Sequence, residues 1–162
     1  MIELVRIDER LLHGQVIVGW GQRLDLGYYV VADDDLAASE WEQELYAGGL
    51  PGSARAFFLT VDEAAVRFGQ LDEHAGRGAL LTRTTGAMRR LAEAGALEGR
   101  AVNLGCLGGA PGRSRALDYV HLSPDEVEDL RAIAARAGPV TARDLPSSPR
   151  VPLEKVLRDL DG

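Results

Sequence analysis

A small group of charged and titratable residues with the means to do chemistry lies near the N-terminus of the chain. It contains two arginines, one acid and one histidine: Arg6, Asp8, Arg10 and His13. The group stands between a first apolar run and an amphipathic segment, where a strand is expected to give way to a helix. The free N–H groups and the dipole of a helix N-terminus favour an anion at such a place. Because a neutral imidazole nitrogen can attack phosphorus, His13 is a candidate nucleophile that carries a phosphoryl group.

Positive charge and backbone donors beside His13 suit the binding of phosphoryl oxygens. The guanidinium groups of Arg6 and Arg10 could offset the charge of the transferring oxygens. Backbone N–H groups from Leu12 to Gln15 could hold the same oxygens. These residues therefore predict an anion site at the turn after the first strand.

Three further residues of the turn have possible roles in the same site. Gly14 would let the backbone approach an anion closely. Asp8 could orient an arginine or the imidazole ring, and the Gln15 side chain could donate a hydrogen bond. The alternative is that His13 only caps a helix and that the arginines are solvated surface. Spacing alone leaves both interpretations open.

Length and composition limit the class of protein. With 162 residues, the chain fits a single domain over 1–162, and 46% hydrophobic with 27% charged residues is typical of a soluble globular protein. A net charge of −7 argues against nucleic acid or an anionic membrane as the partner. The single cysteine, Cys106, fits a reducing compartment, and no apolar run is long enough to span a membrane. We therefore expect a cytoplasmic protein.

The hydrophobic pattern predicts the fold class. Short β-branched or aromatic runs alternate with helical stretches, which indicates an α/β fold with a parallel sheet. We expect a mainly parallel central sheet of about six or seven strands, with helices on both faces. The predicted strands are residues 2–6, 28–32, 55–59, 78–82, 101–104, 119–122 and 140–142.

The stretch from Gly105 to Arg115 is rich in glycine and too irregular for a helix or a strand. It follows a predicted strand, so its basic residues are expected at the carboxyl edge of the sheet, where ligands of α/β proteins usually bind. Arg113 and Arg115 could grip a phosphoryl group or an acidic patch on a partner. Solvated surface is the equal alternative for both.

The residues around His13 resemble a known signature. The segment Arg6-Ile7-Asp8-x-Arg10-Leu11-x-His13-Gly14-Gln15-Val16 is similar to that of the mannose/fructose/sorbose-family IIB component of the bacterial phosphoenolpyruvate-dependent sugar phosphotransferase system. Similarity extends over nearly the whole chain. It includes Trp20 and the segments 30–34, 102–105, 112–113, 118–123 and 143–146.

The resemblance implies a phosphocarrier, a protein-Npi-phosphohistidine–sugar phosphotransferase. His13 would accept phosphoryl through Nδ1 from a phosphohistidine on a IIA partner, and would pass it to a sugar bound by membrane IIC and IID partners. No metal and no cofactor are expected, and a homo-oligomer is possible. The implied site residues are Arg6 and Arg10 flanking the phosphoryl group, Asp8, Leu12, Gly14 and Gln15 in the loop, and Thr82 and Thr84 nearby.

Other functions remain open at this stage. A regulatory phosphoprotein could keep the fold and the phosphorylation but deliver no sugar phosphate. Cys106 could be proposed as a phosphocysteine, although a small residue buried at a strand end is the simpler interpretation. A nucleotide-binding domain is disfavoured because the first turn lacks a glycine-rich phosphate loop.

Overall fold

The computed structural model describes residues 1–161, without the side chains of residues 159 and 161. Its central sheet has seven strands in the order β3-β2-β4-β1-β5-β8-β9. All neighbouring strands are parallel except β8 and β9. The predicted mainly parallel α/β sheet is therefore confirmed. The strands are β1 (Ile2–Ile7), β2 (Leu26–Ala32), β3 (Arg55–Leu59), β4 (Arg77–Thr82), β5 (Val102–Leu104), β8 (Val140–Ala142) and β9 (Val151–Pro152).

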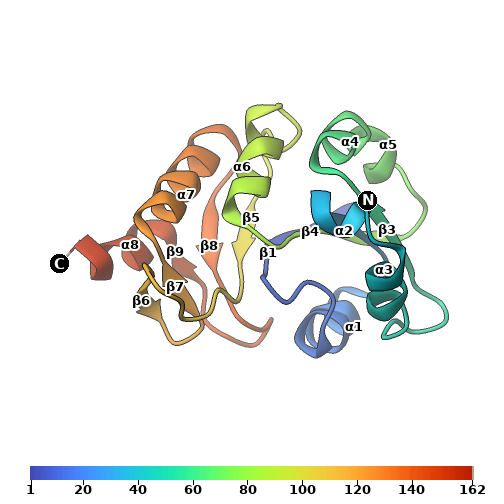
Figure 1. Cartoon of the computed structure of the whole chain (residues 1–162), viewed down its shortest axis with the longest axis horizontal. Coiled ribbons are helices and arrows are strands. Elements are labelled where there is room, and N and C mark those ends of the chain that lie inside the picture. Colours follow the sequence, from blue (N-terminus) through green and yellow to red (C-terminus); the bar gives the residue numbers. More distant parts are fainter. Residues whose placement is uncertain (162) are drawn as a thin grey trace.

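Helices cover both faces of the sheet (Figure 1). Each face has its own apolar cluster because successive side chains of a strand point to opposite sides. One face carries η1 (Gln15–Trp20), α1 (Gly21–Leu24), α2 (Asp34–Ala37) and α3 (Glu40–Ala47). The other carries α4 (Val61–Val66), α5 (Phe68–Asp72), α6 (Thr85–Glu93), α7 (Pro124–Arg136) and α8 (Leu153–Asp161).

Side chains at the helix starts fix where the chain turns back from each strand. Thr60 and Ser123 both form capping boxes, with Glu63 and Glu126 respectively. Asp33 accepts from Leu36 N and so caps α2. Caps of this kind contribute about 1 kcal/mol each.

The segment after β5 departs from the predicted order. Residues 119–122 were expected to be a strand of the main sheet, but β7 (Val120–Leu122) pairs antiparallel with β6 (Ser114–Leu117) in a separate ribbon. The place beside β5 is taken by β8. On the other side of β8, the two-residue strand β9 pairs antiparallel and forms the edge of the sheet. Within residues 1–161, no helix is both long and apolar enough to cross a membrane.

Candidate active site

The register between β1 and β5 places Arg6 beside Asn103. The two residues are direct partners, and the next pair along the strands is Ile7 with Leu104. Ile7 belongs to the apolar cluster under α4 to α8, so its neighbour in the strand, Arg6, points to the opposite face, which carries η1. Arg6 is fully buried there. A buried arginine needs internal partners for its donors.

Every nitrogen of the Arg6 side chain donates to an acceptor inside the protein. Nε and Nη2 donate to Asp8 Oδ2 at 3.3 and 3.0 Å. Nη1 donates to the Asn103 side chain and to the Arg143 carbonyl, and Nη2 also donates to the Asp144 carbonyl at 3.1 Å. The donors of Arg6 are thus occupied by acceptors inside the protein, and its place beside a phosphoryl group stays a prediction from the resemblance. Its position is suited to holding Asp8.

The surroundings of Arg6 leave no free space beside its guanidinium group. A Cβ atom on Gly105 would clash with the Arg6 guanidinium group, so only glycine fits directly after β5. Burial lowers the pKa of Arg6, while the charge of Asp8 opposes this change. The ordinary pKa of an arginine is so high that the side chain stays charged at neutral pH.

Asp8 connects Arg6 to the candidate nucleophile. Asp8 Oδ2 lies 3.0 Å from His13 Nε2, and Asp8 Oδ1 accepts from the backbone N–H of Arg10 at 3.0 Å. Burial alone would raise the pKa of Asp8, but the hydrogen bond from His13 and the charge of Arg6 lower it below its ordinary value. An ionised Asp8 can only accept, so Nε2 of His13 carries the proton and Nδ1 keeps its lone pair. The His13 side chain remains 16% exposed.

The turn that presents His13 has strained backbone. Leu11 has φ of 53°, in the left-handed region that β-carbon sterics disfavour. Its side chain is fully buried and its N–H donates to the Asp8 carbonyl at 3.0 Å, so packing and a hydrogen bond hold the strained conformation. The His13 carbonyl accepts from Val16 N and Ile17 N, and the π-helix η1 follows, with Gly21 N donating to the Val16 carbonyl. Single π turns in helices are frequent at functional sites.

Backbone donors and one arginine remain available around His13. Within residues 1–161, the N–H groups of Leu12, His13 and Gly14 have no acceptor in the chain. The Arg10 side chain is 42% exposed, and its Nη2 donates to Gln15 Oε1. Gln15 therefore accepts from Arg10 with its oxygen, where the sequence had suggested a donor. Of Arg6 and Arg10, Arg10 is the arginine whose side chain is exposed.

A Gly14→Ala substitution should slow phosphoryl acceptance without destabilising the fold. No heavy atom lies within 4 Å of a Cβ built on Gly14, and its φ of −53° suits alanine. We expect the free energy of unfolding to stay equal or rise by up to about 1 kcal/mol. The added methyl group would stand beside the free N–H groups, so phosphoryl acceptance should slow on the order of tenfold, since aligned donors of this kind are sensitive to misplacement.

The matched control is Gly69→Ala on α5, where a Cβ atom also meets open space. Chemical unfolding and a phosphorylation time course would be measured for both variants. A Gly14→Ala variant as fast as Gly69→Ala would contradict close approach of an anion to this backbone.

Thr82 and Thr84 have local structural roles. The carbonyl of Thr82 accepts from Asp8 N at 2.9 Å, which ties the end of β4 to the active turn. The buried hydroxyl of Thr82 donates to the Thr84 carbonyl at 3.0 Å. Thr84 Oγ1 accepts from Ala87 N and caps α6. The two residues shape the loop beside Asp8, and both hydroxyl groups are already engaged within it.

Arg113 lies in a partly buried chain of ion pairs. It forms a bidentate pair with Glu126, at 2.8 Å for each bond, and its Nη1 donates to Glu9 Oε2 at 3.2 Å. Its donors hold α7 to the active turn, so Arg113 is not a simple solvated side chain, and a contact with a phosphoryl group or a partner stays a prediction. Arg115 is exposed and paired with Asp118 on the surface. Glu9 was missed by sequence reasoning, which left its position in the signature undefined.

Cys106 stands near the turn without the properties of a nucleophile. Its carbonyl accepts from Glu9 N at 3.0 Å, and its side chain is half-buried. Burial raises the pKa of the Cys106 thiol. A raised pKa disfavours the thiolate that nucleophilic attack requires.

Sequence reasoning from spacing also missed a layer of residues behind Arg6. Trp20 Nε1 donates to the Asp144 carbonyl at 3.0 Å, and the Trp20 ring stacks with Arg6 and Arg143, whose Cζ atoms lie 5.4 and 5.7 Å from its centroid. Asn103 Nδ2 donates to the Arg143 carbonyl. These residues lie in segments that carry the family resemblance, which was the only signal for them.

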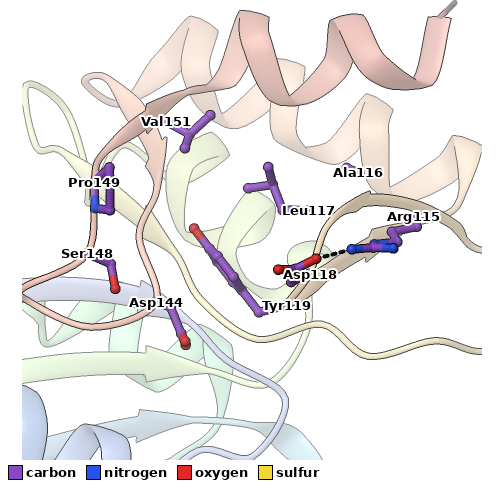
Figure 2. Close-up of a pocket in the computed structure, with 9 residues that line it drawn as sticks. All are labelled: Arg115, Ala116, Leu117, Asp118, Tyr119, Asp144, Ser148, Pro149 and Val151. Atoms are coloured by element: carbon purple, nitrogen blue, oxygen red, sulfur yellow. Dashed lines mark hydrogen bonds and ion pairs between the residues drawn. The ribbon is translucent and has the colours of Figure 1, made fainter.

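Asp144 also borders a surface cavity of about 660 Å³ (Figure 2). Figure 2 shows Asp144 and Ser148 on one side of it and Tyr119 and Leu117 on the other. His13 does not line this cavity. The cavity and the nucleophile are therefore separate features, linked through the Asp144 carbonyl that accepts from Arg6.

Comparisons with known proteins match this geometry to a family. The family model described as PTS system sorbose subfamily IIB component, where PTS stands for phosphotransferase system, matches residues 2–161. The N-acetylgalactosamine-specific phosphotransferase enzyme IIB component 1 of Escherichia coli K12 is 31% identical over 148 residues, which are 90% of this chain and 91% of that protein. The crystal structure of manxB from Thermoanaerobacter tengcongensis superposes with a TM-score of 0.86 at 28% identity, covering 98% of this chain and 95% of that one.

A partial match concerns a longer protein. The mannose-specific EIIAB component of Escherichia coli K12 is 25% identical over 162 residues, 99% of this chain but 50% of that protein. The chain thus spans about half of this relative.

The fold and the turn define an α/β phosphocarrier with a histidine at the carboxyl edge of its sheet. The chain belongs to the sorbose subfamily of IIB components of the sugar phosphotransferase system. Proteins of this class are phosphotransferases, and they work with IIA and membrane IIC and IID partners in general.

Proposed function

We propose that Nδ1 of His13 takes a phosphoryl group from a phosphohistidine on a IIA partner in the cytoplasm. It then delivers the group to a sugar bound by membrane IIC and IID subunits. The observation that carries the proposal is the 3.0 Å contact between His13 Nε2 and Asp8 Oδ2, which leaves Nδ1 as the nitrogen with a lone pair. Family membership supports the direction of transfer.

The transfer replaces one nitrogen–phosphorus bond by another. The bond from the donor histidine to phosphorus breaks as the bond from His13 Nδ1 forms, and the ring becomes positively charged while Nε2 keeps its proton. Asp8 stabilises that charge, and Arg10 with the free N–H groups of the turn faces the phosphoryl oxygens. In the second step the nitrogen–phosphorus bond breaks, a sugar hydroxyl oxygen bonds to phosphorus, and the hydroxyl proton leaves to a base or to water.

Phosphorylation from labelled phosphoenolpyruvate with the general carrier proteins and a IIA protein tests this proposal. We expect one acid-labile, alkali-stable phosphate, assigned by NMR to Nδ1 of His13, that moves to sugar when membranes with IIC and IID are added. Label on Cys106, or on Nε2, would overturn the assignment of the nucleophile. Label that stays on the protein with sugar and those membranes present would favour the regulatory alternative.

A further inference from the structure

Two large apolar side chains are exposed one turn apart on α3. Trp41 is 66% exposed and Leu45 is 68% exposed, and no residue of α3 is buried. A single exposed apolar residue is ordinary, but residues at i and i+4 share one side of a helix. The large exposed apolar residues among those the structure describes are Met1, Val18, Trp41, Leu45 and Val66.

The exposed pair lies on the face of the sheet that carries the active turn. Tyr46 of α3 packs against the same apolar cluster as Leu11 and Leu12 of the turn. Gly49, just after α3, is so close to η1 that a Cβ atom on it would lie 3.9 Å from Ile17 Cδ1. Figure 1 shows α3 beside the helix that follows the active turn. Val18, another exposed apolar residue, belongs to that helix.

The charged side chains of α3 all have one sign. Glu40, Glu42 and Glu44 are each next to Trp41 or Leu45 in the sequence, and the helix contains no lysine or arginine. We name Trp41, Leu45 and these three glutamates the α3 surface. A second copy joined by two-fold symmetry would bring the same acidic surface against itself, which like charges oppose. The complementary partner is apolar and basic.

We propose that the α3 surface docks the chain onto a basic, amphipathic cytoplasmic segment of the membrane subunits that receive the phosphoryl group. This inference rests on the proposed function. Cytoplasmic segments of membrane proteins carry an excess of lysine and arginine, so their charge complements the three glutamates. Aromatic and aliphatic anchors would supply the affinity. Because α3 and the active turn pack into the same apolar cluster on one face of the sheet, docking through α3 would bring the phosphorylated turn toward the membrane.

The test compares wild type with a W41A/L45A double variant and with Val66→Ala. Val66 is 87% exposed on α4, which covers the opposite face of the sheet, so it is the matched control for loss of exposed apolar surface. The probe is inverted membrane vesicles that contain IIC and IID, with vesicles of the same lipid lacking both subunits as the blank. Co-sedimentation of the unphosphorylated chain measures docking without any phosphoryl transfer.

We expect W41A/L45A to bind the subunit-containing vesicles on the order of tenfold more weakly, while Val66→Ala binds as wild type does. Wild-type binding should weaken as salt concentration rises. Phosphorylation by IIA should remain within about twofold of wild type for both variants, since the anion site is untouched. Thermal unfolding confirms that the exposed substitutions leave the fold intact.

Several outcomes would overturn the proposal. One is that wild type and W41A/L45A bind the subunit-containing vesicles equally, and another is that wild type binds vesicles with and without the subunits equally. Slower phosphorylation of W41A/L45A by IIA would also contradict it, as would a wild-type dimer in sedimentation that W41A/L45A does not form. Failure of the proposed function looks different, because His13 would then take no phosphoryl group while docking stayed measurable.

Discussion

A His13→Ala variant is expected to accept no phosphoryl group from IIA, with label at the background of the assay. The substitution removes Nδ1, the nitrogen whose lone pair the contact from Nε2 to Asp8 leaves free. The fold should persist, because Asp8 keeps its hydrogen bonds from Arg6 and from the Arg10 backbone. Thermal unfolding and a labelling time course on the same preparation would separate loss of chemistry from loss of structure.

The matched control for this prediction is His121→Ala. His121 is another partly exposed histidine, on β7, and its ring lies against the Leu107 carbonyl away from Asp8. This variant should label at the wild-type rate. Label that survives in His13→Ala would contradict the role of His13 as the nucleophile.

The strands that could be predicted are those with an apolar pattern of their own. The run at residues 55–59 became β3 without a change of bounds, and its pairing with β2 follows from the alternation of strands and helices. The two-residue β9 has no periodicity to detect. The run at 119–122 was predicted to be a strand, but an apolar pattern does not indicate which strand it pairs with, and β7 pairs with β6.

The residues of the site were predictable where their partners are local. Asp8, Arg10 and His13 lie within one turn, so an anion site was one of two interpretations that their spacing allowed. Besides nearby Asp8, Arg6 has acceptors 97 residues away at Asn103 and 137 away at Arg143, so sequence could not tell a buried arginine from one that faces an anion. The ion pair between Arg113 and Glu9 spans 104 residues and was hidden for the same reason.

An Asp8→Asn variant should accept phosphoryl on the order of a hundredfold or more slowly than wild type. Both oxygens of Asp8 face donors, Arg6 and His13 at Oδ2 and the Arg10 N–H at Oδ1. In either orientation an asparagine would turn its amino group toward a donor. If that group faces His13, Nε2 must accept and the proton moves to Nδ1, which then cannot attack phosphorus.

The same variant should unfold more easily, by about 3 kcal/mol, because the substitution leaves the buried charge of Arg6 without its counter-ion. Asp72→Asn is the control: Asp72 accepts from Ile2 N at 2.8 Å and pairs with Arg100 at 2.7 Å, away from His13. It should lose stability yet label at the wild-type rate. An Asp8→Asn variant that also labelled at that rate would show that Asp8 does not fix the proton on Nε2.

The pH dependence of unfolding gives an independent check on Asp8. The pKa of Asp8 is lowered on folding, below an ordinary value of 3.8, so its contribution to stability is full above about that pH. The contribution is lost as pH falls through the folded pKa, because the carboxyl group must take up a proton that the unfolded chain already binds. The difference in unfolding free energy between wild type and Asp8→Asn should therefore be constant near neutral pH and shrink below about pH 3.8. A difference that stayed constant on acidification would mean that Asp8 is not ionised against Arg6 and His13, and the assignment of the free lone pair to Nδ1 would lose its physical basis.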